Sequence, residues 1–136
     1  MKNNPLISVV IPLYNKEKTI EQSLHSVLRQ KDCEFEIVVV DDGSTDNSVE
    51  QVKKINDTRV RLVSQKNGGP GAARNTGAKA AKGDWIVFLD ADDELLPNAL
   101  KSFAKAILAH PNIDIFDANK YCLLYTSPSP RDRTRS

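Results

Sequence analysis

The sequence has few of the side chains that build disulfide frameworks and metal clusters. Its 136 residues include only two cysteines and two histidines, too few for a disulfide-stabilised fold or for a zinc site made of these side chains. We expect Cys33 and Cys122 to be ordinary thiols in a reducing compartment. The net charge at pH 7 is only +1, so nothing in the overall charge favours nucleic acid as a partner.

Long hydrophobic runs are also missing. No stretch approaches the roughly 20 apolar residues that a membrane-spanning helix needs, so we expect no transmembrane segment in this chain. The apolar run near the N-terminus is short and is broken by Pro12, which is unlike a secretory signal.

What the chain does contain is an alternation of strand-like and helix-like segments. Continuous apolar runs are typical of parallel strands that are covered on both faces. Alternation with helices predicts an α/β fold, a doubly wound and mainly parallel sheet flanked by helices. The expected strands are 7–11, 35–40, 60–63, 85–89 and, more weakly, 113–116, and the expected helices are 19–29, 46–55, 70–82 and 97–109.

The last sixteen residues break this pattern. Residues 121–136 hold two prolines, several serines and threonines and three arginines, without apolar periodicity. Such a composition cannot bury enough apolar surface to join a core. We therefore expect one folded portion over residues 1–120 and a disordered tail over residues 121–136.

Polar side chains follow each of the first four expected strands. Because parallel strands present their carboxyl ends at one edge of a sheet, where ligands bind, we expect these groups to converge on one crevice. The groups are Pro12, Tyr14 and Asn15; Asp41, Asp42, Gly43 and Ser44; Asn67, three glycines and Arg74; and Asp90, Ala91, Asp92 and Asp93.

The acidic group after the fourth strand has two interpretations. Asp90 and Asp92 could hold a hard divalent cation, Mg²⁺ or Mn²⁺, which keeps open positions for phosphate oxygens. Alternatively, Asp92, Asp93 and Glu94 could complement the dipole of a helix that opens near Pro97. Capping explains one or two acids beside a buried strand but not four, so we favour the metal.

The other three groups are each ambiguous when taken alone. Asp41 or Asp42 could accept hydrogen bonds from a base or ribose, or the segment could be an ordinary turn before a capped helix. The glycine-rich stretch before Arg74 could bring backbone and a helix N-terminus to an anion, or could be a flexible loop with a solvated Arg. It does not match the dinucleotide fingerprint. Tyr14 could stack on a base or could be a surface tyrosine.

Taken together, the motifs resemble those of a known family. The segments SVVIPLYNKEKTIEQSLHSVLRQ, FEIVVVDDGSTDNS and NGGPGAARNTGAKAAKGDWIVFLDADD are similar, in this order, to the N-terminal half of a family 2 glycosyltransferase. The resemblance covers about residues 6 to 118. It implies the GT-A fold, a nucleotide-sugar donor that is commonly a UDP-sugar, and Mg²⁺ or Mn²⁺ as the metal.

The resemblance also assigns roles. Asp42 would contact the base or ribose, with Asp41 as the second choice, and Asp92 would be the more direct metal ligand of the DxD pair. The complete set is Pro12 and Tyr14 at the base, Asp41 and Asp42, Asn67 and Arg74 along the nucleotide, and Asp90, Ala91 and Asp92 at the metal.

In this family the catalytic base and the acceptor site lie downstream of the DxD pair. Nothing after Lys120 resembles that half, so we assign no base. We expect a truncated glycosyltransferase whose parent performs inverting transfer to a glycan or lipid-linked acceptor hydroxyl in polysaccharide synthesis. We expect this fragment to bind the donor but to transfer little sugar. We place the parent in the cytoplasm, with the inner face of the membrane as the alternative. The other hypothesis is a nucleotide-binding module without catalysis.

Overall fold

The computed structural model describes residues 5–109 and 124–125. The elements in chain order are β1 (Leu6–Leu13), α1 (Ile20–Leu28), β2 (Glu34–Asp41), α2 (Ser48–Lys53), β3 (Val60–Ser64), α3 (Pro70–Ala80), β4 (Trp85–Phe88), β5 (Glu94–Leu95), α4 (Ala99–Ala109) and β6 (Leu124–Tyr125).

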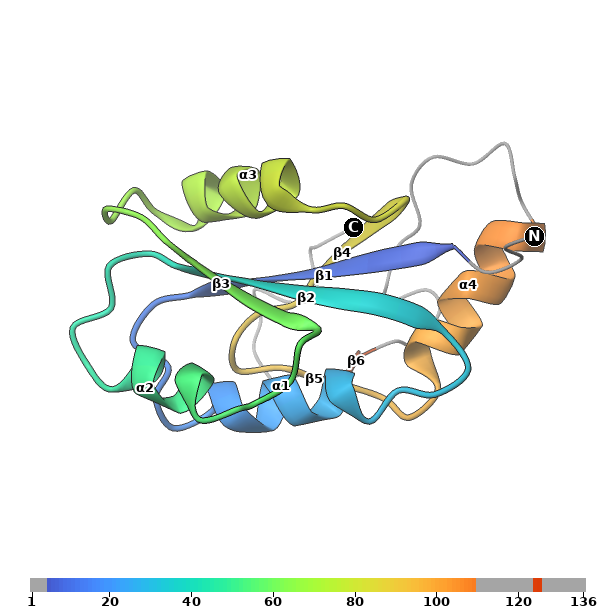
Figure 1. Ribbon diagram of the computed structural model, residues 1–136, viewed down its shortest axis with the longest axis horizontal. Helices are drawn as coiled ribbons and strands as arrows, with labels where there is room; N and C mark the ends of the chain where they lie inside the picture. Colours follow the sequence, from blue (N-terminus) through green and yellow to red (C-terminus); the bar gives the residue numbers. More distant parts are fainter. Residues whose placement is uncertain (1–4, 110–123, 126–136) are drawn as a thin grey trace.

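Four of the strands form a parallel sheet in the order β3-β2-β1-β4. Leu13 at the end of β1 pairs with Asp41 at the end of β2, which in turn pairs with Ser64 at the end of β3. The loops that follow these three strands therefore emerge at one edge, at the left in Figure 1. The predicted fold, a mainly parallel sheet flanked by helices, is confirmed.

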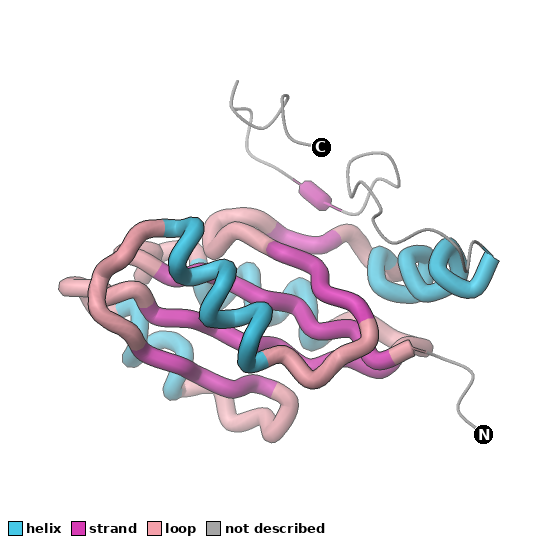
Figure 2. Tube along the Cα trace, turned by 90° about the horizontal axis from the view of Figure 1, so that it is seen from above, coloured by secondary structure: helices cyan, strands magenta, loops and turns pink. Residues whose placement is uncertain are grey.

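Each face of the sheet has its own apolar core, because successive side chains of a strand point to opposite faces. On one face Ile7, Val9, Ile11 and Leu13 of β1 pack in a cluster with residues of α1 and α4. On the other face, Val10 packs with residues of β2 and α3. Figure 1 shows α3 on one side of the sheet with α1 and α2 on the other, and Figure 2 shows α3 lying over the strands. None of the helices in the described residues has both the length and the apolar character needed to cross a bilayer.

Two element predictions need correction. The strand expected at 85–89 ends at Phe88, whose side chain is 39% exposed rather than buried on both faces. The physical reason is that α3 packs mainly over β1 and β2, so β4, at the end of the sheet order, is covered less. The helix expected from Pro97 begins at Ala99, because Asn98 adopts a positive φ of 64° that a right-handed helix does not allow.

The C-terminal predictions are mostly untested. The strand expected at 113–116 and most of residues 121–136 lie outside the described residues. Within that last segment, Leu124 and Tyr125 form β6, which pairs antiparallel with β5. The boundary expected at residue 120 stays a prediction.

Candidate functional site

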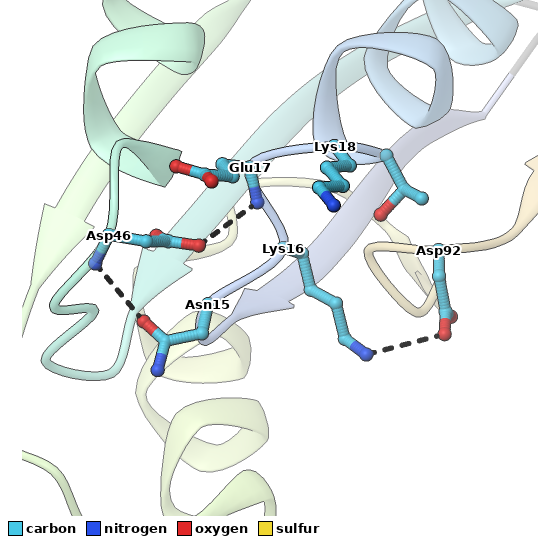
Figure 3. A pocket seen from close by; sticks show the side chains of 7 residues that line it. Asn15, Lys16, Glu17, Lys18, Asp46 and Asp92 are labelled. Atoms are coloured by element: carbon cyan, nitrogen blue, oxygen red, sulfur yellow. Dashed lines mark hydrogen bonds and ion pairs between the residues drawn. The ribbon is translucent and has the colours of Figure 1, made fainter.

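The loops after β1 and β2 are joined by a network of hydrogen bonds. Asn15 adopts a φ of 51°, and its side-chain oxygen accepts hydrogen bonds from the backbone N–H groups of Thr45 at 2.8 Å and Asp46 at 3.3 Å. In return, the Asn15 backbone N–H donates to Ser44 Oγ at 3.0 Å, and the Lys16 backbone N–H donates to Ser48 Oγ at 2.8 Å. The two loops therefore form one fixed wall of the site, part of which is drawn in Figure 3.

This network contains a residue that sequence reasoning left out of the predicted site. Asn15 was noted only as a polar residue after the first strand, yet its side chain holds the neighbouring loop. The available signal was an Asn directly after a strand, since Asn tolerates the left-handed conformation and bonds to nearby backbone.

Asp42 lies under the glycine-rich loop. It is 3% exposed. Its Oδ1 accepts hydrogen bonds from Gln65 Nε2 at 2.9 Å and from the Gly68 N–H at 2.8 Å. Its Oδ2 accepts from Asn67 Nδ2 at 3.2 Å and from the Gly69 N–H at 3.0 Å. Burial disfavours the charge, but the hydrogen bonds from Gln65, Gly68 and Gly69 outweigh it and hold the pKa of Asp42 below its ordinary value. The acceptor capacity of this carboxylate is therefore used within the fold.

Asp41 differs from its neighbour in its partners. It is also buried, at 6% exposure. Among the described residues its carboxylate accepts one hydrogen bond, from the Ser44 N–H at 3.2 Å. A carboxylate can accept about four hydrogen bonds, so Asp41 retains capacity for a ligand that Asp42 does not.

The glycine-rich loop leads directly into α3. Gly69 has a φ of 96° and precedes Pro70, which opens the helix at its favoured first position. Arg74 follows in the second turn, and its Nη2 lies 3.8 Å from Asp90 Oδ1. Arg74 therefore connects the glycine-rich side of the site with the acidic turn after β4.

The acidic turn brings three carboxylates together. Asp90, Asp92 and Asp93 each offer an oxygen, and these oxygens lie within 4.8 Å of one another. Asp90 and Asp92 are partly buried, and Asp93 is 6% exposed. A compact set of oxygen donors fits a hard divalent cation.

The alternative of helix capping is wrong for these acids. They lie in the turn before the two-residue strand β5, and α4 begins only at Ala99, whose N–H donates to Leu96 O at 3.1 Å. Asp93 joins Asp90 and Asp92 in the carboxylate cluster.

A row of polar side chains on α1 holds the acidic turn and the segment that follows it. Ser23 Oγ lies 2.9 Å from Ala91 O and 2.5 Å from Asp93 O, and the Leu95 N–H donates to Ser26 Oγ at 3.0 Å. The four residues of the row recur at helical spacing: Thr19, Ser23, Ser26 and Gln30. Sequence reasoning used only the apolar residues of this helix and missed the row.

A hollow of about 410 Å³ lies between the first loop and the acidic turn. Its lining residues, shown in Figure 3, are Asn15, Lys16, Glu17, Lys18, Thr19, Asp46 and Asp92. Lys16 reaches across it, with Nζ 3.5 Å from Asp92 Oδ2. The edge thus combines buried acceptors, a glycine-rich loop, two cations and a carboxylate cluster. Together with the parallel sheet, these features define an α/β protein with a candidate ligand site and a candidate metal site at one edge of the sheet.

Comparison with known proteins gives the family. The profile of glycosyl transferase family 2 matches residues 8–134. The chain is 46% identical over 91 residues to EpsJ, an uncharacterised glycosyltransferase of Bacillus subtilis. The matched stretch covers 65% of this chain and 26% of EpsJ. The chain belongs to glycosyltransferase family 2, so the resemblance stated from its motifs is confirmed.

Solved structures of similar chains share the GT-A fold. TarS of S. aureus, residues 1–349 in complex with UDP-GlcNAc, matches with a TM-score of 0.73 and 40% identity over 77% of this chain and 32% of that one. The mannosyltransferase PcManGT of Pyrobaculum calidifontis, in complex with GDP-Man and Mn²⁺, matches with a TM-score of 0.70 and 28% identity over 80% of this chain and 33% of that one. The chain thus spans about a third of each solved neighbour.

Proposed function

We propose that residues 1–120 are the donor-binding portion of a glycosyltransferase, which binds a UDP-sugar together with Mg²⁺ or Mn²⁺. The observation that carries this proposal is the 3.8 Å approach of Arg74 to Asp90. It places the helix after the glycine-rich loop beside the carboxylate cluster, so that one diphosphate can lie between a guanidinium and a metal. The TarS complex with UDP-GlcNAc and the PcManGT complex with GDP-Man and Mn²⁺ support this class of ligand.

The base and ribose belong on the side of the fixed loops. Tyr14 is 47% exposed just beyond β1 and offers an aromatic face, with Pro12 beside it, for stacking on a planar base. We assign the hydrogen bond to the base or ribose to Asp41 in preference to Asp42, because the four acceptor positions of Asp42 are used by the glycine-rich loop. Asn67 borders the same space.

The diphosphate belongs on the side of the acidic turn. Asp90 and Asp92, separated by Ala91, would hold the cation, with Asp93 as a third carboxylate close by. When bound, the cation would neutralise the charge that develops on the departing diphosphate. The guanidinium of Arg74 would be a second positive charge beside the diphosphate.

The proposal also includes the reaction and the location of the whole enzyme. We infer inverting transfer of the sugar to the hydroxyl of a glycan or lipid-linked acceptor in polysaccharide synthesis. The enzyme would work in the cytoplasm or at the inner face of the membrane. We assign no catalytic base. No observation favours the alternative of a nucleotide-binding module without catalysis.

Titration calorimetry with UDP tests the donor site. Wild-type protein should bind UDP more tightly with Mn²⁺ than with a chelator. Arg74→Ala should weaken UDP binding by a factor of about 10 to 100, because a charge-assisted contact to phosphate contributes about 1.5–3 kcal/mol. Lys79→Ala is the matched control, since Lys79 is an exposed cation on the same helix, and its affinity should not change.

Circular dichroism shows whether each variant is folded. A folded wild type that does not bind UDP would contradict the donor site. Equal affinity with Mn²⁺ and with chelator would contradict only the metal. If Arg74→Ala and Lys79→Ala bind equally well, Arg74 does not contact the donor.

A further inference from the structure

Within residues 5–109, ion pairs bring two cationic side chains against the carboxylate cluster. Arg74 approaches Asp90 and is already assigned to the donor. The second is Lys16, whose Nζ lies 3.5 Å from Asp92 Oδ2, as the dashed line in Figure 3 shows. We propose that Lys16 is an internal counter-ion of the metal site, which competes with the divalent cation for Asp92 and lowers the affinity of the site for metal. This inference rests on the proposed function.

The backbone of Lys16 is held by hydrogen bonds, whereas its side chain is partly exposed. The Lys16 N–H donates to Ser48 Oγ at 2.8 Å, and the next N–H, of Glu17, lies 3.3 Å from Asp46 Oδ2. The side chain beyond this anchor is 45% exposed and has a flexible four-carbon stem. The ammonium can therefore rest on Asp92 or turn into solvent without any change in the loop.

An ammonium and a metal ion cannot share this carboxylate without cost. A protonated lysine has three donors and no acceptor, so it cannot join the coordination shell. It lies 3.5 Å from Asp92 Oδ2, one of the two oxygens that this carboxylate offers to a metal. A divalent cation at the same oxygen would also repel the ammonium at short range. Binding of metal therefore requires the ion pair to break.

The expected effect is modest because the pair is partly solvated. The side chains of Lys16 and Asp92 are 45% and 25% exposed. Measured coupling in exposed ion pairs corresponds to factors of up to about five in an equilibrium constant. Removal of the ammonium should therefore raise the metal affinity about two- to fivefold, a gain that loss of an ordinary structural contact would not produce.

Titration of Mn²⁺ without nucleotide tests the inference, with free Mn²⁺ measured by electron paramagnetic resonance. Lys16→Gln should bind Mn²⁺ about two- to fivefold more tightly than wild type. Lys16→Arg, which keeps the charge, should stay close to wild type. Lys53→Gln is the matched control for net charge, because Lys53 is an exposed cation in the last turn of α2, does not line the hollow and forms no ion pair within residues 5–109; its affinity should not change.

The outcomes separate this inference from the proposed function. If wild type binds Mn²⁺, Asp92→Asn loses it, and Lys16→Gln matches Lys53→Gln, the metal site stands and the counter-ion is disproved. An equal gain for Lys16→Arg and Lys16→Gln would also disprove it, since the charge would not be the cause. If neither wild type nor Lys16→Gln binds Mn²⁺ while both remain folded, the counter-ion and the metal of the proposed function both fail, whereas the UDP titration decides the donor site separately.

Discussion

Asp42 shows at the scale of one residue how a charge can be held by the fold. Its carboxylate accepts two side-chain and two backbone hydrogen bonds from the segment between Gln65 and Gly69. Each bond fixes one point of a loop that is rich in glycine and therefore flexible. The burial that makes the charge costly also strengthens these bonds. The position of Asn67 and of the start of α3 thus depends on this one side chain.

Asp42→Asn should destabilise the protein in a pH-dependent way. An amide presents a donor to N–H groups that need acceptors, so we expect a loss of about 1–3 kcal/mol in the free energy of unfolding at pH 7. The pKa of Asp42 is lower in the folded state than its ordinary value of 3.8. The stabilisation is therefore complete above that value and is lost as the pH falls through the folded pKa.

Urea unfolding at pH 7 and near pH 3 measures this effect. The difference between wild type and Asp42→Asn should shrink at the lower pH. Glu50→Gln serves as the control, because Glu50 is an exposed carboxylate in the first turn of α2 and should change stability by less than about 0.5 kcal/mol. A difference that is the same at both pH values would mean that the charge of Asp42 is not what holds the loop.

Sequence reasoning predicted that Asp41, Asp42, Arg74 and Asp90 follow strands of one parallel sheet, whose carboxyl ends lie at one edge. Their roles in binding stay a prediction. Sequence reasoning could not tell which of the two neighbouring aspartates keeps acceptor capacity. That depends on the path of the loop after β3, which no local pattern specifies.

At the scale of elements, the contact of α3 with the sheet is unusually close. Gly77 is buried on the face of α3 that packs on the strands. A Cβ atom there would overlap Val10 Cγ1 and would lie 3.2 Å from Val40 Cγ2. Because both valines belong to the inner strands, neither can move without disturbing the core. Gly77 therefore sets the distance between helix and sheet, and with it the place of Arg74.

Gly77→Ala should destabilise the protein by about 1–3 kcal/mol, the usual cost of overpacking a core. Gly71→Ala on the same helix is the matched control, since a Cβ at that position would meet nothing within 4 Å. Its higher helix propensity should leave stability unchanged or raise it by up to about 1 kcal/mol. Thermal unfolding of both variants measures the contrast. Equal losses would show that the close contact at Gly77 is not the cause of its cost, because a Cβ at Gly71 makes no such contact.

The element boundaries that sequence reasoning missed have local causes. Pro97 predicted a helix start, but Asn98 takes a left-handed conformation and delays α4. The strand β5 has only two residues, and its partner β6 lies far along the chain. Two residues are too few to show the alternating apolar pattern that predicts a strand. The polar row on α1, by contrast, was visible as serines and threonines at helical spacing. It was missed because only the apolar face of that helix was considered.

At the scale of the molecule, alternation of strands and helices was enough to predict a parallel sheet, but not its order. The order β3-β2-β1-β4 places the strand that carries the acidic turn beside the first strand rather than beside the third. This arrangement brings together β1 and β4, which are far apart in the sequence. The Leu6 N–H, for example, donates to Asp84 Oδ2, 78 residues away.

Because of the sheet order, the two sides of the site should differ in their stability against local unfolding. The proposed nucleotide side is carried by β1, β2 and β3, whereas the acidic turn follows β4, which within the described residues pairs only with β1. Thr19 and Ser23 hold the same turn from the side of α1. Local opening of β4 would therefore loosen the strand side of the acidic turn, while its contacts with α1 and the loops after the other three strands stay in place.

Amide hydrogen exchange detects such openings. The amides of β4 and of Leu89, which donates to Val10 O at 3.0 Å, should exchange faster than those of Val38 to Val40 in β2. Added Mn²⁺ should slow exchange in residues 85–93 first, because a cation shared by several carboxylates would hold the turn closed. If β4 and β2 exchange at the same rate, the acidic turn is as permanent as the sheet. Faster exchange in β4 that Mn²⁺ slows would mean that a bound cation also stabilises the position of β4.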